Sequence, residues 1–186
     1  MIGLTWVIGL FRPKSYKLRE QRNIERLRRH GVRIGTDCRI YSSHFSTEPW
    51  LVTIGDRVGI AGGVKFLTHD GSAMLVRGRR PEAQKLGLIQ VGNDVFISEN
   101  AILLPGTSIG DGSIIGPGAV VHGTIPPNSL VYGNPADIIG RASLYRERLL
   151  VDPNTLDTLN LPAADRRKRI LAHFGLAGAK GDRHDD

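Results

Sequence analysis

The chain contains few residues of two kinds. Cys38 is the only cysteine among 186 residues, which excludes an intrachain disulfide framework and fits a reducing compartment such as the cytoplasm. Aromatic residues make up only 6% of the chain, whereas glycine occurs 23 times. This balance favours a turn-rich β architecture built from small side chains over a helical bundle. A chain of this length is expected to form one domain with extensions.

A hydrophobic run long enough to cross a membrane is also lacking. The apolar segment MIGLTWVIGLF at residues 1–11 is too short to span a bilayer, no basic residues precede it, and no small-residue cleavage site follows it. The simplest interpretation is a segment that packs on the domain or on a neighbouring subunit. A shallow contact with a membrane surface is the alternative.

Acidic residues are fewer than basic residues, and most of the excess positive charge lies in one short segment. The formal net charge is +7, and residues 12–30 hold eight Lys and Arg against Glu20 and Glu25, a net charge of +6. No aromatic interleaving or recognition motif accompanies these cations, which argues against nucleic acid as the partner. A solvated helix face is the common explanation. The functional alternative is an anionic substrate or membrane surface, and the apolar segment before this helix favours the membrane.

What the chain does contain is a repeat of six residues. Aliphatic side chains recur at Val91, Ile97, Leu103, Ile109, Ile115 and Val121. Four residues after each come Val95, Ala101, Thr107, Ser113, Ala119 and Ile125, nearly all small. The same phase appears earlier at Ile54, Ile60 and Phe66, with Val58 and Val64 in the small position, and begins roughly at Ile34 and Ile40.

A period of six fits neither an amphipathic helix nor an alternating strand. It fits a short strand and a tight turn, used three times in each coil of a triangular solenoid. The aliphatic residue then points inward, and the small residue points inward near a corner. Gly92, Gly110 and Gly116 follow the aliphatic residue and are expected to serve the turn backbone. Each coil buries its core only by stacking on the next coil.

Two stretches carry a family resemblance. VTIGDRVGIAGGVKFLTHDG (52–71) resembles the catalytic coil of the hexapeptide-repeat acyltransferases, and IGDGSIIGPGAVVHGTIPPNSLVYGNPADIIG (109–140) resembles their last coil and exit. The closest resemblance is to the galactoside, maltose and xenobiotic acetyltransferases and to relatives that modify surface polysaccharides. It implies a mainly β fold, a left-handed parallel β-helix, over residues 31–141. It also implies acetyl-CoA as co-substrate and a homotrimer with active sites between subunits.

The sequence on either side of the repeat predicts helices. The expected organisation is an apolar segment and basic helix at 1–30, the β-helix at 31–141 with an excursion loop at 70–88, and C-terminal helices with a disordered tail at 142–186. In the helix at 13–30, Leu18, Ile24 and Leu27 are expected to face inward. The short C-terminal helices are expected at 142–150 and 163–174.

His69 is the candidate catalytic residue. Acetyl transfer needs a base to take the acceptor proton, and a histidine suits that task at neutral pH. His69 stands three residues after Phe66, where the repeat stops, and the resembling enzymes carry their catalytic histidine at this place. Asp70 could orient the ring or bind the acceptor, or it could simply form an Asp-Gly turn. Cys38 falls in the small inward position, so we expect a packed thiol and direct transfer in a ternary complex.

The resemblance also implies where coenzyme A lies. It should run along the groove between neighbouring solenoids, where backbone groups of the turns bind the pantetheine arm. Carried over by motif, the contacts are Ser98, Glu99, Gly116, Pro117, His122, Asn134, Pro135, Ala136 and Arg141. Arg141 could bind a nucleotide phosphate. His122-Gly123 stands where the family often has Thr-Lys, so a lysine contact to the phosphates is expected to be missing.

The acceptor is less well defined by the sequence. YSSHFSTEPW (41–50) lies in the coil that lines the acceptor side in relatives, and its candidate contacts are Tyr41, Ser43, His44 and Glu48. The loop at 70–87 carries Arg77, Arg79, Arg80 and Lys85. These cations would suit an anionic acceptor such as a nucleotide-linked or lipid-linked sugar, and a solvated loop is the alternative.

The expected function is therefore acetyl-CoA-dependent acetylation of a sugar hydroxyl or amino group in surface polysaccharide biosynthesis. The expected location is the cytoplasm or the inner face of the membrane. One rival is a γ-carbonic-anhydrase-like enzyme, but that class needs three zinc histidines with a closely spaced pair, which this chain lacks, so no metal is expected. The other rival is a non-catalytic solenoid that serves as a scaffold.

Overall fold

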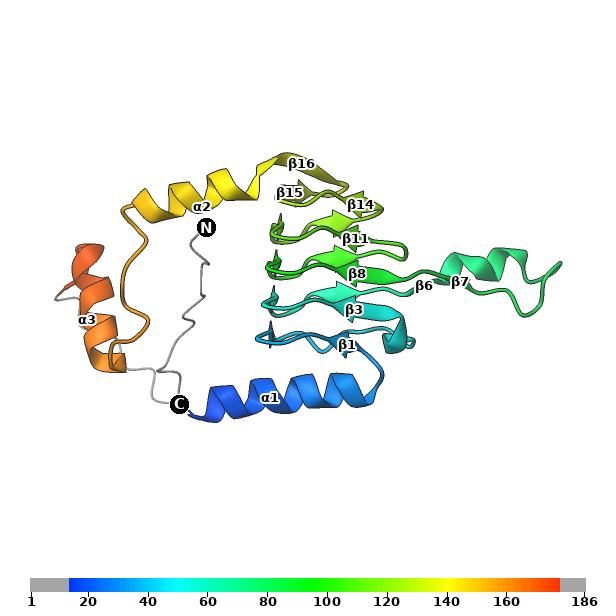
Figure 1. Ribbon diagram of the computed structural model, residues 1–186, viewed down its shortest axis with the longest axis horizontal. Helices are drawn as coiled ribbons and strands as arrows, with labels where there is room; N and C mark the ends of the chain where they lie inside the picture. The colour runs from blue at the N-terminus through cyan, green and yellow to red at the C-terminus, as the bar shows by residue number, and fades with distance from the viewer. Residues whose placement is uncertain (1–13, 178–186) are drawn as a thin grey trace.

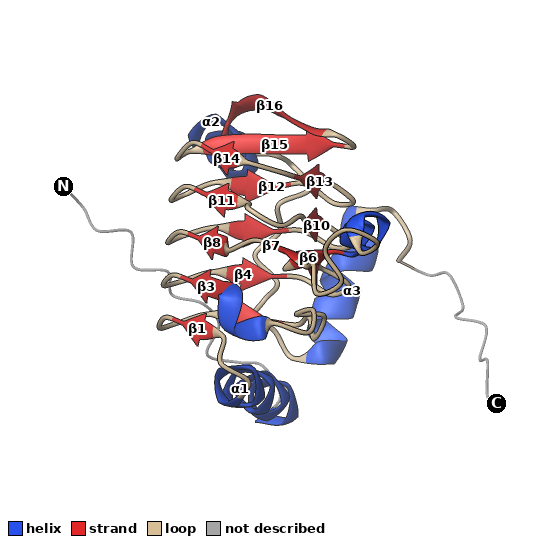
Figure 2. Ribbon diagram, turned by 90° about the vertical axis from the view of Figure 1, so that its right-hand side faces the viewer, coloured by secondary structure: helices blue, strands red, loops and turns tan. Residues whose placement is uncertain are grey.

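The repeat folds into a triangular solenoid with three parallel sheets as its faces (Figures 1 and 2). The computed structural model describes residues 14–177. Sheet A contains β1 (Arg33–Ile34), β3 (Val52–Ile54), β8 (Ile89–Val91), β11 (Ser108–Ile109) and β14 (Thr124–Ile125). Sheet B contains β2 (Arg39–Ile40), β4 (Gly59–Ile60), β9 (Phe96–Ile97), β12 (Ile114–Ile115), β15 (Ser129–Gly133) and the antiparallel β16 (Ala136–Arg141). Sheet C contains β5 (Lys65–Phe66), β10 (Ile102–Leu103) and β13 (Val120–Val121).

The coils stack in register, which places equivalent hexad residues above one another. Ile109 pairs with Val91 on one side and with Ile125 on the other. The inward aliphatic positions are buried, and so are the small corner positions such as Ala101 and Ala119. Each fully buried aliphatic side chain contributes about 1.5–3 kcal/mol. The predicted core is confirmed.

The hexad glycines have a different cause from the expected one. Gly92, Gly110 and Gly116 are absent from the glycines with positive φ, so the turn backbone does not require them. They are needed for space, since a Cβ at Gly92 would lie 2.2 Å from Asp111 Oδ1 of the next coil. That oxygen accepts a hydrogen bond from the Asn93 N–H at 2.8 Å. Asp56, Asn93 and Asp111, which each follow an Ile-Gly or Val-Gly pair at the end of a sheet A strand, thus tie one coil to the next through their side-chain oxygens.

Helix α1 (Lys14–Arg29) lies across the first coil (Figure 1). Leu27 is buried and Ile24 packs against the core, as expected. The prediction for Leu18 is wrong, because this side chain is 46% exposed. Asn23 Nδ2 on the coil-facing side of α1 donates to the carbonyls of Ile40 and Ser42. Leu18 lies nine residues before Leu27, which at 3.6 residues per turn places it on the opposite side of the helix. The apolar segment 1–11 lies outside the described residues.

A hairpin projects sideways from the solenoid where the repeat stops (Figure 1). It consists of β6 (His69–Asp70), a 3₁₀ helix (Gly71–Val76) and β7 (Lys85–Leu86), with β6 and β7 antiparallel. A second 3₁₀ helix (Pro49–Leu51) precedes β3.

Two helices follow the last coil, α2 (Ala142–Val151) and α3 (Ala163–His173). Figure 1 shows α2 leading away from the solenoid. Most of the predicted tail, residues 178–186, lies outside the described residues. Of the helices that the structure describes, none combines the length and hydropathy needed to cross a bilayer.

Candidate active site

His69 meets Glu48 at the corner between sheet C and sheet A. Its Nδ1 atom lies 2.9 Å from Glu48 Oε2, and the hydroxyls of Ser46 and Thr47 lie 3.2 and 3.3 Å from the same nitrogen. The His69 side chain is 42% exposed and the Glu48 side chain only 17%. Glu48 therefore sits behind the ring and fixes it from one side. In the described part of the chain, Nε2 has no hydrogen-bond partner, so this nitrogen is the one available to a substrate.

Glu48 is itself held by hydroxyl groups. The Thr47 hydroxyl donates to Oε1 at 2.6 Å, and the buried Thr68 hydroxyl donates to Oε2 at 2.8 Å. The Thr47 hydroxyl and the His69 ring lower the pKa of Glu48 to about 2. A carboxylate with that pKa stays ionised at neutral pH and accepts a hydrogen bond from the Nδ1–H of His69, which selects the tautomer with a basic Nε2.

The coil register explains how these two residues meet. His44 forms a parallel bridge with Lys65, and the rings of Phe45 and Phe66 stack at 4.3 Å between centroids. Phe45 is therefore the inward residue of the first coil on this face, five residues after Ile40 instead of six. Counting three residues on from each phenylalanine places Glu48 in register with His69. The sequence named Glu48 only as an acceptor contact, because the six-residue phase hides this alignment.

Asp70 is engaged by its own hairpin. Its carboxylate accepts from the Ser72 N–H at 2.9 Å and pairs with Lys85 Nζ at 2.8 Å. These contacts, with Lys85 first, hold the pKa of Asp70 well below its usual range. Asp70 thus closes the base of the hairpin beside His69, and the contacts within the described chain do not include the His69 ring.

Most of the predicted coenzyme contacts gather at the corner between sheet B and sheet C. The Gly118 N–H donates to the Glu99 carbonyl at 2.9 Å. This hydrogen bond stacks the turn that contains Ser98 and Glu99 on the turn that contains Gly116 and Pro117. The turn of Asn134, Pro135 and Ala136 continues this column, because β15 follows β12 in sheet B. We call these residues the turn column: Ser98, Glu99, Gly116, Pro117, Asn134, Pro135 and Ala136.

Two predicted coenzyme contacts lie elsewhere. His122 is exposed and follows β13 in sheet C, two coils above Leu67, so it lies on the His69 side of the solenoid. Arg141 pairs with Ser129 at the far end of β16 from Ala136. The structure therefore does not bring Arg141 together with the turn column of its own chain.

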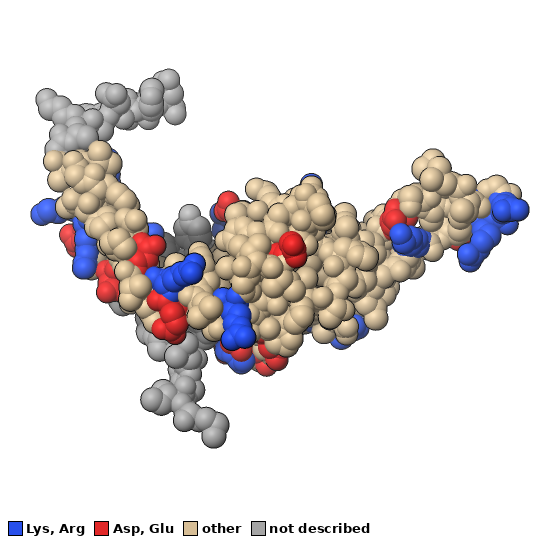
Figure 3. All heavy atoms as spheres, turned by 90° about the horizontal axis from the view of Figure 1, so that it is seen from above, with Lys and Arg blue, Asp and Glu red and all other residues tan. Residues whose placement is uncertain are grey.

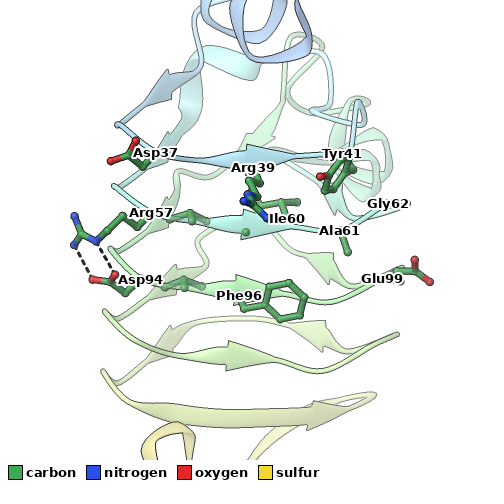
Figure 4. A pocket seen from close by; sticks show the side chains of 13 residues that line it. Asp37, Arg39, Tyr41, Arg57, Ile60, Ala61, Gly62, Asp94, Phe96 and Glu99 are labelled. Atoms are coloured by element: carbon green, nitrogen blue, oxygen red, sulfur yellow. Dashed lines mark hydrogen bonds and ion pairs between the residues drawn. The ribbon is translucent and has the colours of Figure 1, made fainter. Parts of the chain in front are cut away.

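A groove of about 540 Å³ crosses the outer face of sheet B at the first three coils (Figure 4). It exists because Gly59 has no side chain beside Phe96, whose Cδ2 would lie 2.9 Å from an added Cβ. Tyr41, a predicted acceptor contact, and Glu99 of the turn column both line it. The Arg57–Asp94 ion pair, at 2.7 Å, closes the other end. The remaining acceptor candidates, Ser43 and His44, follow Tyr41 and are exposed, and His44 is bridged to Lys65 of sheet C.

The thiol of Cys38 is not placed for catalysis. Its Sγ atom donates to the Gly55 carbonyl at 3.1 Å and packs against the core. Burial raises the pKa of this thiol, which disfavours the nucleophilic thiolate. In residues 14–177, no group of three His, Cys, Asp or Glu side chains could hold a metal ion.

Comparison with known proteins agrees with this architecture. A family model described as bacterial transferase hexapeptide (six repeats) matches residues 89–123. Protein CapG of Staphylococcus aureus is 40% identical over 139 residues, which cover 73% of this chain and 81% of that protein. The chain belongs to the hexapeptide-repeat acyltransferases. Its solenoid is accordingly a left-handed β-helix, as the sequence predicts.

Solved structures of hexapeptide-repeat acetyltransferases also match the chain. A hexapeptide-repeat acetyltransferase from Vibrio cholerae is 30% identical with a TM-score of 0.54, and the match covers 60% of this chain and 63% of that one. A structure of that acetyltransferase complexed with acetyl coenzyme A has a TM-score of 0.53. The polysialic-acid-specific acetyltransferase NeuO is 26% identical with a TM-score of 0.52, over 63% of each chain. This chain thus spans about three fifths of the length of these solved proteins.

Proposed function

We propose that this hexapeptide-repeat protein transfers the acetyl group of acetyl-CoA to a hydroxyl or amino group of a sugar. The observation that carries the proposal is the Glu48–His69 pair at the start of the projecting hairpin. The acetyl-CoA complex of the Vibrio cholerae acetyltransferase supports the choice of co-substrate. The similarity to NeuO, a polysialic-acid-specific acetyltransferase, supports a surface polysaccharide as the pathway's product.

His69 acts in this proposal as the general base. Its Nε2 takes the acceptor proton while the acceptor oxygen or nitrogen attacks the thioester carbonyl, and the thiolate of coenzyme A leaves as the carbonyl re-forms. The ionised Glu48 keeps Nδ1 protonated and stabilises the imidazolium that forms. No covalent acyl-enzyme is needed, because Cys38 is packed away from the His69 corner.

The active site is proposed to lie between subunits of a homotrimer. In a triangular prism the corner that carries His69 is opposite the face that carries the groove, so one chain cannot present both to one substrate. A neighbouring copy could place its His69 against the turn column and groove. The outer faces support such contacts, since sheet B exposes Phe96 and sheet C presents Ile102 and Val120, whereas Gln90 and Thr124 are exposed on sheet A.

The acceptor is proposed to be an anionic sugar conjugate, either nucleotide-linked or lipid-linked. Arg77, Arg79 and Arg80 are exposed on the hairpin, and Figure 3 shows Lys and Arg gathered at the tip of this projection. Lys85 at its base is paired with Asp70. We place the protein in the cytoplasm, with residues 1–30 in peripheral contact with the inner face of the membrane.

An acceptor screen tests the proposed function. Purified protein is first titrated with acetyl-CoA in a thermal-shift assay, and free thiol is then measured over a panel of sugars, nucleotide sugars and lipid-linked sugars. The proposal predicts stabilisation by acetyl-CoA and acceptor-dependent thiol release. Absence of coenzyme binding would instead support the scaffold reading.

A further inference from the structure

The hairpin that begins at His69 exposes a cluster of apolar side chains. Met74, Leu75 and Val76 of its 3₁₀ helix are all exposed, and Leu75 is 82% exposed. Because the hairpin projects away from the solenoid (Figures 1 and 3), the rest of the described chain does not cover them. Such a cluster is typical of a contact with another molecule. We call these three residues the hairpin cluster.

The groove on the outer face of sheet B provides an apolar surface. Gly59, Ala61 and Phe96 line it, and the Phe96 ring is half exposed. At the fourth coil the equivalent outward residue, Ile114, is only 8% exposed. The apolar floor of the groove therefore ends at the third coil.

The hairpin and the groove lie at the same level along the solenoid. The hairpin leaves the second coil after β5 and returns to the third coil at β8. The groove is lined by residues of β2, β4 and β9, which belong to the first three coils. The hairpin starts at the corner opposite sheet B, so it cannot enter the groove of its own chain. In a trimer with parallel solenoids, it meets a neighbouring subunit at the level of that subunit's groove.

The charges of the two surfaces are complementary. Three Asp and Glu residues and two Arg residues line the groove, a net charge of −1. Hairpin residues 71–84 contain three Arg and one Glu, a net charge of +2. Within the described residues, the carboxylate of Glu99 has no hydrogen-bond or ion-pair partner, and the same holds for the guanidinium groups of Arg79 and Arg80. These groups are therefore available to a partner subunit.

We propose that the hairpin cluster of one subunit docks in the sheet B groove of the next. Leu75 would pack against Ala61 and Phe96, and the hairpin cations would face the carboxylates of the groove. Since the hairpin starts at His69, this contact would hold that histidine beside the turn column of the neighbour. The inference rests on the proposed function, and it names the contact that completes each site between two subunits. A contact with a lipid or an unrelated protein would leave the shared level of hairpin and groove without a reason.

Disulfide crosslinking of the full chain tests this docking without using acetyl transfer. In a Cys38→Ala background, the variant Ala61→Cys/Leu75→Cys carries one thiol in the groove and one on the hairpin. Mild oxidation is expected to give covalent dimers and trimers on a denaturing gel, because a disulfide forms only where the Cα atoms come within about 7 Å. The control Gln90→Cys/Leu75→Cys carries the second thiol on the outer face of sheet A. It should stay monomeric on the gel, as should each single-cysteine variant.

A single substitution on the wild-type background gives a second readout. Leu75→Asp should raise the concentration at which the trimer dissociates by at least about 10-fold, because it would bury a charge in the groove. Leu150→Asp, at a similarly exposed position of α2, should leave that concentration unchanged. Light scattering over a dilution series measures both.

Three results would overturn the proposal. They are a trimer of Ala61→Cys/Leu75→Cys that does not crosslink, equal crosslinking of the sheet A control, and crosslinking that saturating acetyl-CoA prevents, which would assign the groove to the coenzyme. Light scattering and thiol release separate this failure from that of the proposed function. A monomeric chain without acceptor-dependent thiol release would refute both, whereas an active trimer without the crosslink would refute only the docking.

Discussion

The Glu48–His69 pair joins residues of two adjacent coils. Thr68 is fully buried and sets the position of the Glu48 carboxylate, which then sets the His69 ring. A histidine supported in this way loses less entropy when it meets a substrate, because its ring is already oriented. The 42% exposure of His69 leaves the other edge of the ring open to solvent and substrate.

Glu48→Gln is expected to lower kcat by about 10- to 100-fold, because an amide neither stabilises the imidazolium nor reliably selects the Nε2-basic tautomer. The affinity for acetyl-CoA should be unchanged, since Glu48 lies at another corner from the turn column. Steady-state kinetics with isothermal titration of acetyl-CoA would measure both. Glu82→Gln, at an exposed hairpin position, is the matched control. A wild-type kcat in Glu48→Gln would show that Glu48 has no part in the reaction.

The same carboxylate makes stability depend on pH. The folded pKa of Glu48 is lowered to about 2 from an ordinary value of 4.5. Because the pKa is lower in the folded chain than in the unfolded chain, Glu48 contributes its full stabilisation at pH values above about 4.5. That stabilisation declines as the pH falls from about 4.5 toward 2. Between pH 7 and pH 3 wild type should therefore lose more in Tm than Glu48→Gln does. Identical losses measured by calorimetry would mean that the contacts of Glu48 do not stabilise the fold.

At this scale the sequence predicted His69 but not its partner. The place of His69 follows from the end of the repeat, which is visible in the residues. The pairing of Glu48 with His69 depends on Phe45. Phe45 points inward five residues after Ile40, where the repeat predicts a spacing of six, and this shifts the register of the first coil by one residue. The bridge between His44 and Lys65 and the stacking of Phe45 on Phe66 reveal that shift in the structure. Asp70 could be recognised as a turn residue, but its pairing with Lys85 depends on how the hairpin closes.

The elements of the solenoid depend on single aliphatic side chains. Ile109 is 2% exposed and lies between Val91 and Ile125. Ile109→Ala is expected to reduce the free energy of unfolding by about 2–5 kcal/mol, because it removes a buried side chain and leaves a cavity. Ser108→Ala, the neighbouring outward position, should stay within about 0.5 kcal/mol of wild type. Chemical denaturation compares them, and equal effects would argue against the inward assignment of Ile109.

Most of the elements could be predicted because the hexad is a local signal. Strands and helices α1, α2 and α3 lie where the sequence places them, since periodicity and burial agree there. The role of the hexad glycines could not be predicted from the sequence. They are required because the next coil approaches closely, whereas the local backbone does not need them. Leu18 was misplaced because nine residues separate it from Leu27, which at 3.6 residues per turn places the two side chains on opposite sides of the helix.

The whole molecule is expected to be a trimer of about three times 20.3 kDa. Phe96 is 49% exposed at the centre of the apolar face of sheet B, and a charge there would be buried at a subunit contact. Phe96→Glu should therefore lower the mass measured by light scattering toward that of one chain. Gln90→Glu, on the outer face of sheet A, should leave the trimer intact. A wild-type mass for Phe96→Glu would exclude sheet B from the contact.

The arrangement of the site at this scale could not be predicted from one chain. The coenzyme contacts were assigned by motif, and the structure separates them from His69 by the width of the prism. His122 and Arg141 also fall outside the turn column, because β13 and the end of β16 belong to other corners. The distances between these residues depend on which face or corner of the solenoid each one occupies. The hexads show where the repeat lies, but they do not assign each residue to a face.

The most direct test of the account is the rate of free coenzyme A release by His69→Ala with the best acceptor. The account predicts a fall in kcat of about 100- to 10,000-fold, while acetyl-CoA binds as it does to wild type. Release of coenzyme A at the wild-type rate would contradict the assignment of His69 as the general base.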